Sequence, residues 1–289
     1  PVTAEDLQGA GAMAALLTEA LKPNLVQTLE GQPFLVHAGP FANIAQGNNS
    51  VLADRIALKL GDYVVTESGF GADCGLEKFM DIIARQSGLQ PDCVVVTCTI
   101  RALKMHGGLG RVVAGRALPK ELREEILPAL NQGAANMIWA VGIARRFGVP
   151  VVVAINQFDD DTEAEIALLK EKAIEAGAVG CATSRAFIDG GPGAVELADL
   201  VKQAANGPKD FHLLYPDDAS IKEKIHTVAT LLYNAEDVSY APEAERQIRN
   251  YEELGWGSLP ICIAKTHLSL SHDPSRKGVP GHYVFPIRE

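Results

Sequence analysis

The sequence predicts an α/β protein built on a predominantly parallel sheet. Three apolar runs, at 34–37, 63–67 and 93–99, each stop at a loop rich in polar residues and glycine. A fourth run, 151–155, is apolar throughout, which is typical of a central strand covered on both faces. Ligands of such folds bind beyond the carboxyl ends of the strands, so we expect the loops to share one rim.

Helices are expected between and after these strands, because capping residues mark where they begin. Ser50 can cap a helix over 51–60, and Thr162 with Glu165 forms a capping-box pattern for a helix that ends near residue 176. The other helices are expected at 7–20, 76–88, 119–147, 194–205, 221–233 and 242–254, and further extended segments at 179–183, 211–214, 259–265 and 283–287.

Composition narrows the class of protein. The chain has 289 residues, 47% of them hydrophobic and 21% charged, with a formal net charge of -10. It contains no Lys/Arg-rich run and no apolar stretch of about 20 residues, so neither nucleic acid nor a membrane is an expected partner. Its five cysteines form no C-x-x-C pair and are expected to be reduced, as in a cytoplasmic protein. Because the chain begins at Pro1 and stops after an extended run, we interpret it as a fragment.

Polar residues after the first two apolar runs are candidates for a ligand site. The amide of Asn43 could bind a phosphate or serve only in a turn. Glu67, Asp73 and Lys78 could serve a metal, proton transfer or a phosphate, whereas individually a capping Asp73 and a surface Lys78 are the plainer interpretations.

Lys104 and His106 place two potential cations just before a Gly-Gly pair. A lone histidine is more often structural, but glycines at 107 and 108 permit close backbone approach to a ligand and so favour a functional role. His267 and His272 fit no standard helical metal pair and are interpreted as structural.

Two aromatic side chains follow apolar strands closely. Phe158 comes directly after 151–155 and Asn156, and Phe187 follows the run at 179–183. Two rings at one rim could hold a flat heterocycle by stacking, and the alternative is that both belong to the core. The chain has no G-x-x-x-x-G-K-[ST] phosphate loop, and the glycines at 190–193 are interpreted as an ordinary turn.

Several long motifs resemble the formate–tetrahydrofolate ligase family, in the same order along nearly the whole chain. They are His-Ala-Gly-Pro-Phe-Ala-Asn-Ile-Ala from His37, Phe-Gly-Ala-Asp from Phe70, Arg-Ala-Leu-Lys-Met-His-Gly-Gly from Arg101, Phe-Gly-Val-Pro-Val-Val-Val-Ala-Ile-Asn from Phe147, and Ala-Lys-Thr-His-Leu-Ser-Leu-Ser from Ala264.

The resemblance implies a mechanism and a set of ligands. ATP phosphorylates formate to formyl phosphate, and N10 of tetrahydrofolate then attacks the formyl carbon. Mg²⁺ would accompany ATP, a monovalent cation such as K⁺ would activate the enzyme, and homotetramers would be the usual assembly. The enzyme's own tasks would be neutralising charge and orienting three ligands.

The resemblance also implies roles for individual residues. Phe158 and Phe187 match positions that stack on the pterin, where many relatives have Trp at the second. Lys78 matches a lysine of the active-site cleft and would neutralise developing phosphate charge. The other matching residues near the cleft have no individual role assigned; they are Asn43, Glu67, Asp73, Lys104, His106 and Asn156.

Three positions depart from the family pattern. Ala140 and Ile143 stand where bacterial relatives often carry His and Asn, and Asp189 stands where many have Lys. An aspartate at that place would repel the anionic glutamate tail of folate. We therefore expect the preference or affinity for the folate tail to differ from that of these relatives.

The resemblance places this chain downstream of the family's phosphate loop. Residues 1–136 would be the later part of a P-loop NTPase-like nucleotide and formate domain, and 137–289 most of a folate-binding C-terminal α/β domain. We expect the piece to be inactive alone. The alternatives are a catalytically silent folate-binding module or split subunit that needs a complementing N-terminal half, and an unrelated NTPase-like interaction protein.

Overall fold

The computed structural model describes residues 2–110, 112, 115 and 117–289. The chain divides into two compact units, one formed by 1–40 with 48–67 and the other by 41–47 with 68–289.

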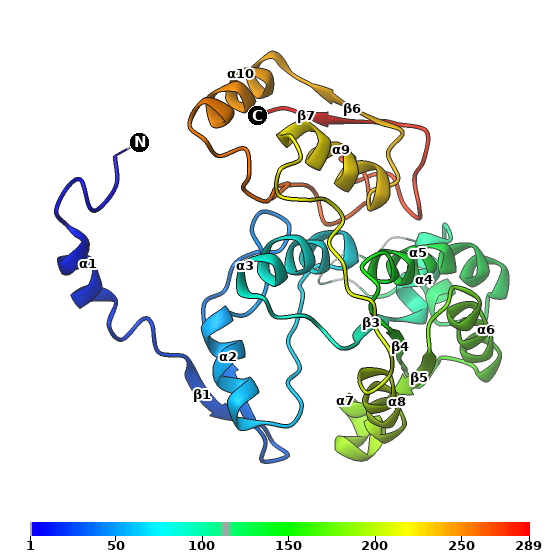
Figure 1. The fold of residues 1–289 in the computed structure, drawn as a ribbon. Coiled ribbons are helices and arrows are strands. Elements are labelled where there is room, and N and C mark those ends of the chain that lie inside the picture. The colour runs from blue at the N-terminus through cyan, green and yellow to red at the C-terminus, as the bar shows by residue number, and fades with distance from the viewer. Residues whose placement is uncertain (1, 111, 113–114, 116) are drawn as a thin grey trace. The chain divides into compact units, whose positions relative to one another are not determined.

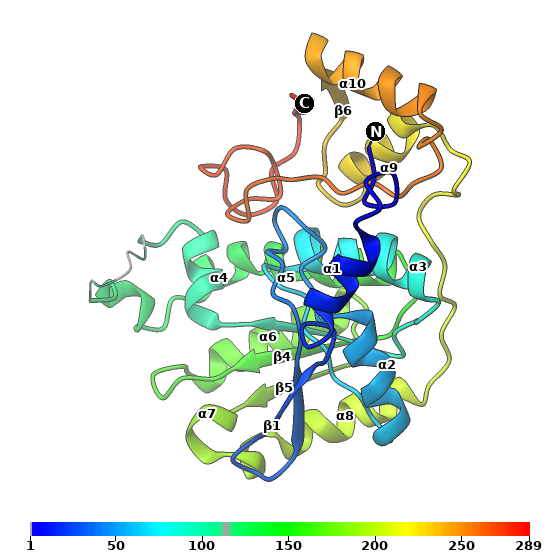
Figure 2. The same cartoon turned by 90° about the vertical axis from the view of Figure 1, so that its left-hand side faces the viewer.

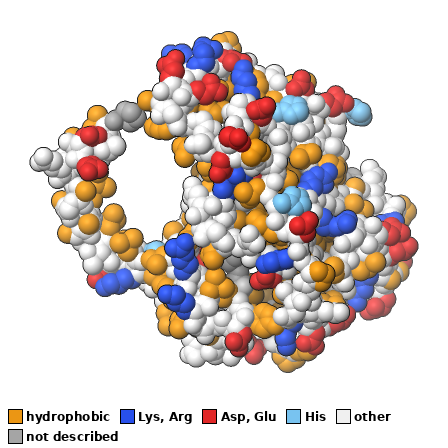
Figure 3. Space-filling model, in the orientation of Figure 1, with side chains coloured by type: hydrophobic (Ala, Val, Ile, Leu, Met, Phe, Trp, Pro, Cys, Tyr) orange, Lys and Arg blue, Asp and Glu red, His pale blue; other side chains and the backbone are white. Residues whose placement is uncertain are grey.

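The first unit contains a helix, a hairpin and a second helix. Helix α1 (Ala10–Leu17) has no buried residue, and β1 (Asn24–Gln27) pairs antiparallel with β2 (Pro33–Val36). Figure 3 shows apolar side chains along the α1 segment. Helix α2 (Val51–Leu60) begins at Ser50, whose hydroxyl accepts a hydrogen bond from the Ala53 backbone N–H, which confirms the expected cap.

Two strand predictions in this unit are wrong. The run at 34–37 forms β2, but it pairs antiparallel with β1, which the sequence pattern missed, because a short loop lets the chain fold back locally. The run at 63–67 forms no strand, and Val65 is almost fully exposed. This run pairs with no strand among the residues described.

The second unit is organised around a parallel sheet, which confirms the predicted α/β class. Strands β3 (Val94–Cys98), β4 (Val151–Asn156) and β5 (Gly180–Ser184) lie in that order, with β4 in the centre (Figure 1). The first five residues of β4 are buried, as expected for a strand covered on both faces. Cys98 pairs with Ile155, and Asn156 with Ser184, so the strands end together.

Helices cover both faces of this sheet. Figure 2 shows α5 (Leu127–Arg145) and α6 (Glu163–Glu175) on one side and α8 (Val195–Ala205) on the other. Helix α6 has the predicted capping box of Thr162 and Glu165. Shorter helices complete the connections; they are α4 (Ile100–His106), η3 (Lys120–Leu122), α7 (Ala186–Asp189) and η4 (Gly191–Ala194).

Helices α4 and α5 meet backbone to backbone at two glycines. A Cβ on Gly107 would lie 1.9 Å from the Ala129 carbonyl oxygen, and one on Gly133 would lie 1.7 Å from that of Leu103. Gly107 therefore allows two helices to approach each other closely. The interpretation that it makes room for a ligand is wrong.

The helix expected at 76–88 is wound in an unusual way. Residues Ala72–Leu76 (η1) and Phe79–Ala84 (η2) form π-helical turns, followed by one turn of α-helix, α3 (Arg85–Ser87). Such turns are rare and are found frequently at functional sites. They bury the polar side chains of Glu77, Lys78 and Asp81.

The C-terminal part of the second unit contains two helices and a small parallel sheet. Helices α9 (Ile221–Leu231) and α10 (Pro242–Glu253) flank β6 (Asp237–Tyr240), which pairs with β7 (Val284–Ile287). The segments at 211–214 and 259–265, expected to be extended, pair with no strand of the described chain. The predicted domain boundary at 136/137 falls inside α5, and it stays a prediction about a longer protein.

Candidate functional site

The carboxyl ends of β4 and β5 carry the two aromatic side chains singled out in the sequence. Asn156 is exposed at the end of β4, and the backbone N–H of Gln157 donates to the Ser184 carbonyl at 3.0 Å, which extends the pairing by one residue. Phe158 follows with 37% of its surface exposed, and Phe187 in α7 is fully exposed. Neither ring belongs to the core, so the core alternative is wrong for both.

Three consecutive aspartates hold the loop around Phe158. Asp159 forms an ion pair with Arg185 at 3.3 Å, and Asp160 pairs with Arg101. Asp161 accepts a hydrogen bond from the Phe158 backbone N–H at 2.8 Å, and burial raises the pKa of its carboxyl. Each carboxylate thus ties the loop to a different partner, and together they fix where Phe158 lies.

Arg185 also binds Asp189, one of the three residues expected to depart from the family pattern. Its Nε donates to the Asp189 carboxylate at 2.8 Å within the short helix α7. The negative charge of Asp189 is therefore partly balanced, and the cation nearest to it is shared by two carboxylates. The glycines at 190–193 form the expected turn and η4.

Lys78, Asp73 and Asn43 are brought together by main-chain contacts. Lys78 is fully buried and its ammonium donates to the Ala42 carbonyl oxygen. The Asn43 carbonyl accepts the backbone N–H of Lys265 at 2.9 Å, and the Lys265 ammonium pairs with Asp73 at 2.5 Å. Sequence reasoning missed Lys265, although it lies in one of the long family-like motifs.

Two buried carboxyl groups lie close to Lys78 in the sequence. The side-chain oxygens of Glu77 are buried and have no hydrogen-bond partner. The buried Asp81 carboxylate has Arg85 at 3.9 Å, and the Leu214 backbone N–H is close enough to oppose the rise of its pKa. Burial raises the pKa of Asp81 to about 7 and that of Glu77 well above its usual range. Nothing in the sequence pattern pointed to them, since acidic residues in a helical segment normally face solvent.

Lys104 forms an ion pair inside the protein. Its ammonium lies 2.5 Å from the Glu165 carboxylate, and it also donates to the Glu124 carbonyl at 2.7 Å. Both side chains are at most 1% exposed. The ammonium is thus occupied by the start of α6 and the chain before α5, which favours a structural role for Lys104.

His106 is half-buried at the end of α4 and binds a later loop. Its Nδ1 accepts the backbone N–H of Gly278 at 3.1 Å, so the neutral ring carries its proton on Nε2. Asn136 of α5 donates to the Gly278 carbonyl at 3.3 Å. Burial lowers the pKa of His106, and the nearby Lys277 lowers it further, so the neutral form is favoured.

Glu67 lies in the first compact unit, where the side chains of Asn48 and Asn49 bind backbone groups. Its carbonyl accepts a hydrogen bond from the Asn48 side-chain amide at 2.9 Å. The Asn49 side-chain oxygen accepts the backbone N–H of His37 at 3.2 Å. In both contacts an asparagine side chain binds the loop backbone, which favours a structural role for Asn48 and Asn49. Asn43 belongs to the other unit.

His267 and His272 contact aromatic rings. His267 stacks on Phe70 with 4.7 Å between ring centroids, and His272 lies 6.0 Å from Tyr283. Among the described residues no group of three or more His, Cys, Asp or Glu side chains could hold a metal ion. The same residues include no helix with the length and apolar character needed to cross a bilayer.

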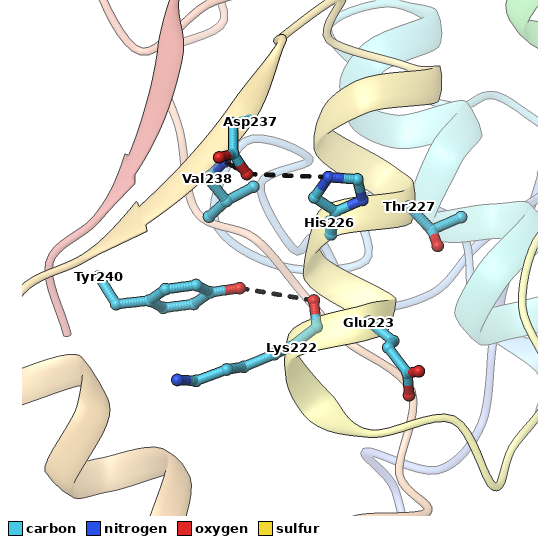
Figure 4. A pocket seen from close by; sticks show the side chains of 7 residues that line it. All are labelled: Lys222, Glu223, His226, Thr227, Asp237, Val238 and Tyr240. Atoms are coloured by element: carbon cyan, nitrogen blue, oxygen red, sulfur yellow. Dashed lines mark hydrogen bonds and ion pairs between the residues drawn. The ribbon is translucent and has the colours of Figure 1, made fainter.

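A surface pocket between α9 and β6 lies apart from the predicted residues (Figure 4). Lys222 pairs with Glu245 at 2.7 Å, and His226 faces Asp237 at 3.8 Å. The Tyr240 hydroxyl donates to the Lys222 carbonyl at 3.4 Å. These contacts satisfy the pocket's charges internally, which makes it a poor candidate for a charged ligand.

The fold and the rim define an α/β protein whose exposed aromatic and polar groups gather at the carboxyl end of a parallel sheet. The model of the formate–tetrahydrofolate ligase family matches residues 1–289, and the chain belongs to that family. It is similar to a formate–tetrahydrofolate ligase of Desulforamulus reducens, with 64% identity over 289 residues, covering 100% of this chain and 51% of the relative.

Other curated relatives agree. A formate–tetrahydrofolate ligase of Roseiflexus castenholzii is 56% identical over 100% of this chain and 51% of its own length. The cytoplasmic C-1-tetrahydrofolate synthase of Mus musculus is 51% identical over 292 residues, 31% of its length. The chain therefore spans about half the length, or less, of the curated relatives it matches.

Proposed function

We propose that this chain forms the folate side of a formate–tetrahydrofolate ligase. In the longer protein, ATP and formate would give formyl phosphate, and N10 of tetrahydrofolate would take up the formyl group. The observation that carries the proposal is the pair Phe158 and Phe187, both exposed, at the ends of neighbouring parallel strands. Exposed rings at a strand-end rim suit a flat heterocycle that is partly apolar and partly polar.

The residues of the rim would orient the folate. Stacking on Phe158 and Phe187 would restrict rotation of the pterin, and the exposed Asn156 amide offers both a donor and an acceptor for the edge of the heterocycle. Holding the nucleophile in a fixed direction is a large part of what such a site can contribute to the rate.

The proposed catalytic residues differ in how well their contacts support them. His106 keeps a neutral ring with an Nε2–H, which can donate a hydrogen bond to a developing negative charge. Lys78, with Asp73 and Asn43 beside it, remains our candidate for neutralising phosphate charge in the longer protein. Lys104 is the weakest candidate because Glu165 occupies its ammonium, and Glu67 is kept as a substrate-site candidate on the family motif alone.

The nucleotide and the cations do not fit the described residues of this chain. The sequence has no phosphate loop, and its described part offers no cluster of metal-ligand side chains. ATP, Mg²⁺ and a monovalent cation such as K⁺ are therefore proposed for the longer protein only. We also propose, for the longer protein, assembly with a second copy or with an N-terminal half. A cytoplasmic location like that of the mouse relative is proposed as well.

Binding of tetrahydrofolate to the 289-residue chain tests the proposal. We expect measurable binding by calorimetry, and a loss of about five- to 100-fold in affinity for Phe158→Ala and for Phe187→Ala, since each removes an aromatic face worth about 1–3 kcal/mol of stacking. Phe34→Ala is the matched control, because Phe34 is an exposed phenylalanine of the hairpin. Absence of binding by the unmodified chain, or equal losses in all three variants, contradicts the proposal.

A second candidate, a catalytically silent folate-binding module, is favoured by the lack of a phosphate-loop motif in this sequence. The chain alone is then expected to bind tetrahydrofolate without forming 10-formyltetrahydrofolate. Adding the N-terminal half of the Desulforamulus reducens relative distinguishes the two candidates. Restored turnover supports a part of the ligase, and binding without turnover supports the module.

A further inference from the structure

The aromatic side chain of Phe158 has a cation on one of its faces. The Arg101 guanidinium carbon lies 3.8 Å from the centre of the ring, within the range of a strong cation–π contact. Arg101 is largely buried in α4, and its Nη2 pairs with Asp160 of the Phe158 loop. Its Nε is buried and makes no hydrogen bond, so the guanidinium is held by the ring and by one carboxylate.

This arrangement leaves one side of the ring for a ligand. Arg101 covers one face, the Asp161 carboxylate holds the Phe158 backbone N–H, and 37% of the residue remains exposed. A planar ligand that stacks on Phe158 therefore has only the uncovered face to use.

The cation also changes the ring that the ligand meets. The face of a benzene ring is electron-rich, and a positive charge on one face draws π-electron density toward itself. The opposite face then repels an electron-rich partner less. In tetrahydropterin, N5 and N8 are amine nitrogens instead of the imine-type nitrogens of the oxidised pterin of folic acid, which makes the reduced ring system more electron-rich.

We propose that Arg101 is a positioning and specificity residue, which holds Phe158 from behind and favours a reduced, electron-rich pterin on the open face. The proposal rests on the proposed folate site and adds to it the reason for a preference between oxidation states. Asp160 serves by fixing the guanidinium over the ring.

The test compares affinities for tetrahydrofolate and folic acid in the 289-residue chain. Arg101→Leu removes the charge and is expected to lower tetrahydrofolate affinity by about three- to tenfold, with a smaller loss for folic acid, so the ratio falls. Arg101→Lys keeps a charge and is expected to retain part of the ratio. Arg123→Leu is the matched control, because Arg123 faces the same Asp160 at 3.9 Å while Phe158 has Arg101 over it.

The outcomes separate the inference from the function on which it rests. A ratio that falls in Arg101→Leu, stays in Arg123→Leu and is partly kept in Arg101→Lys supports the role of Arg101. An unchanged ratio in Arg101→Leu, with tetrahydrofolate still bound, overturns that role and leaves the folate site standing. Failure of the unmodified chain to bind either ligand overturns the folate site and this inference with it. A melting temperature for each variant identifies a general loss of folding, which would lower both affinities equally.

Discussion

Lys104 and Glu165 form an ion pair 2.5 Å long that solvent does not reach. Glu165 is also the third residue of the α6 capping box, where its carboxylate accepts the Thr162 backbone N–H at 3.3 Å. The same carboxylate accepts the backbone N–H of Ile126 at 3.3 Å. One carboxylate therefore joins the end of α4, the start of α5 and the start of α6.

We predict that Lys104→Met lowers the free energy of unfolding by about 3–5 kcal/mol, because it leaves the Glu165 charge buried without its partner. Urea unfolding of the variant measures the change. Lys104→Met combined with Glu165→Gln should recover part of the loss, since the uncompensated charge is gone. A Lys104→Met variant that is as stable as the unmodified chain but binds substrates poorly would instead support the functional role first expected of this lysine.

Sequence reasoning succeeded where the signal was local. The strands β3, β4 and β5 and the caps at Ser50 and Thr162 follow from apolar runs and from a polar residue at a helix start, and all were predicted. Phe158 and Phe187 were also placed correctly at strand ends. Each of these features depends on residues close together in the sequence, so the local sequence pattern predicts it.

The features that failed depend on residues far apart in the sequence. Lys104 was singled out as a cation just before a Gly-Gly pair because nothing nearby in the sequence revealed Glu165. Gly107 was expected to make room for a ligand because Ala129 was not known to lie against it. The run at 63–67 has the residue types of a strand, yet a strand also needs a partner to pair with. Burial of Glu77 and Asp81 follows from π-helical winding, which no periodicity predicted.

Stability should change with pH around the buried carboxyl of Asp81. Its pKa is raised to about 7 in the folded protein by burial, from an ordinary 3.8, so ionisation is harder in the folded than in the unfolded chain. The group's contribution to stability is therefore complete at low pH and lost as the pH rises through 7. Asp81→Asn, which cannot ionise, should gain about 2 kcal/mol over the unmodified chain at pH 8.5 and much less at pH 5.

Urea midpoints at the two pH values measure this difference. Asp199→Asn is the control, because it makes the same chemical change at an exposed aspartate on α8. Equal differences at pH 5 and pH 8.5 would mean that burial does not control the ionisation of Asp81.

His106 should act in the opposite direction. Burial and Lys277 lower its pKa in the folded protein below 6.5, so the unfolded chain takes up a proton more readily. Stability from this group is complete above pH 6.5 and is lost as the pH falls below it. His106→Gln can still accept the Gly278 N–H and cannot titrate, so its stability should fall less than that of the unmodified chain between pH 7.5 and 5.5.

The same urea unfolding series measures this effect, with His226→Gln as the control. His226 is a histidine of α9 whose side chain is about half exposed, so the same substitution is made there at a more exposed site. Parallel pH curves for the unmodified chain and His106→Gln would contradict the prediction.

Asp189 should govern how the proposed folate site treats the glutamate tail. Asp189 and Asp159 share the Arg185 guanidinium, at 2.8 and 3.3 Å, so little of its positive charge is available to an anionic ligand. Asp189→Asn frees part of that charge, and Asp189→Lys adds another cation. We predict that Asp189→Asn raises the affinity for polyglutamyl tetrahydrofolate, relative to the monoglutamyl form, by about two- to fivefold, which is the size expected of a partly exposed charge. Asp189→Lys should raise this ratio of affinities further.

The gain should shrink in 0.5 M salt, because screening weakens exposed charge interactions. Glu196→Gln, which removes an exposed negative charge from α8, is the control for net charge alone. An unchanged ratio in both Asp189 variants would mean that the tail does not pass near α7.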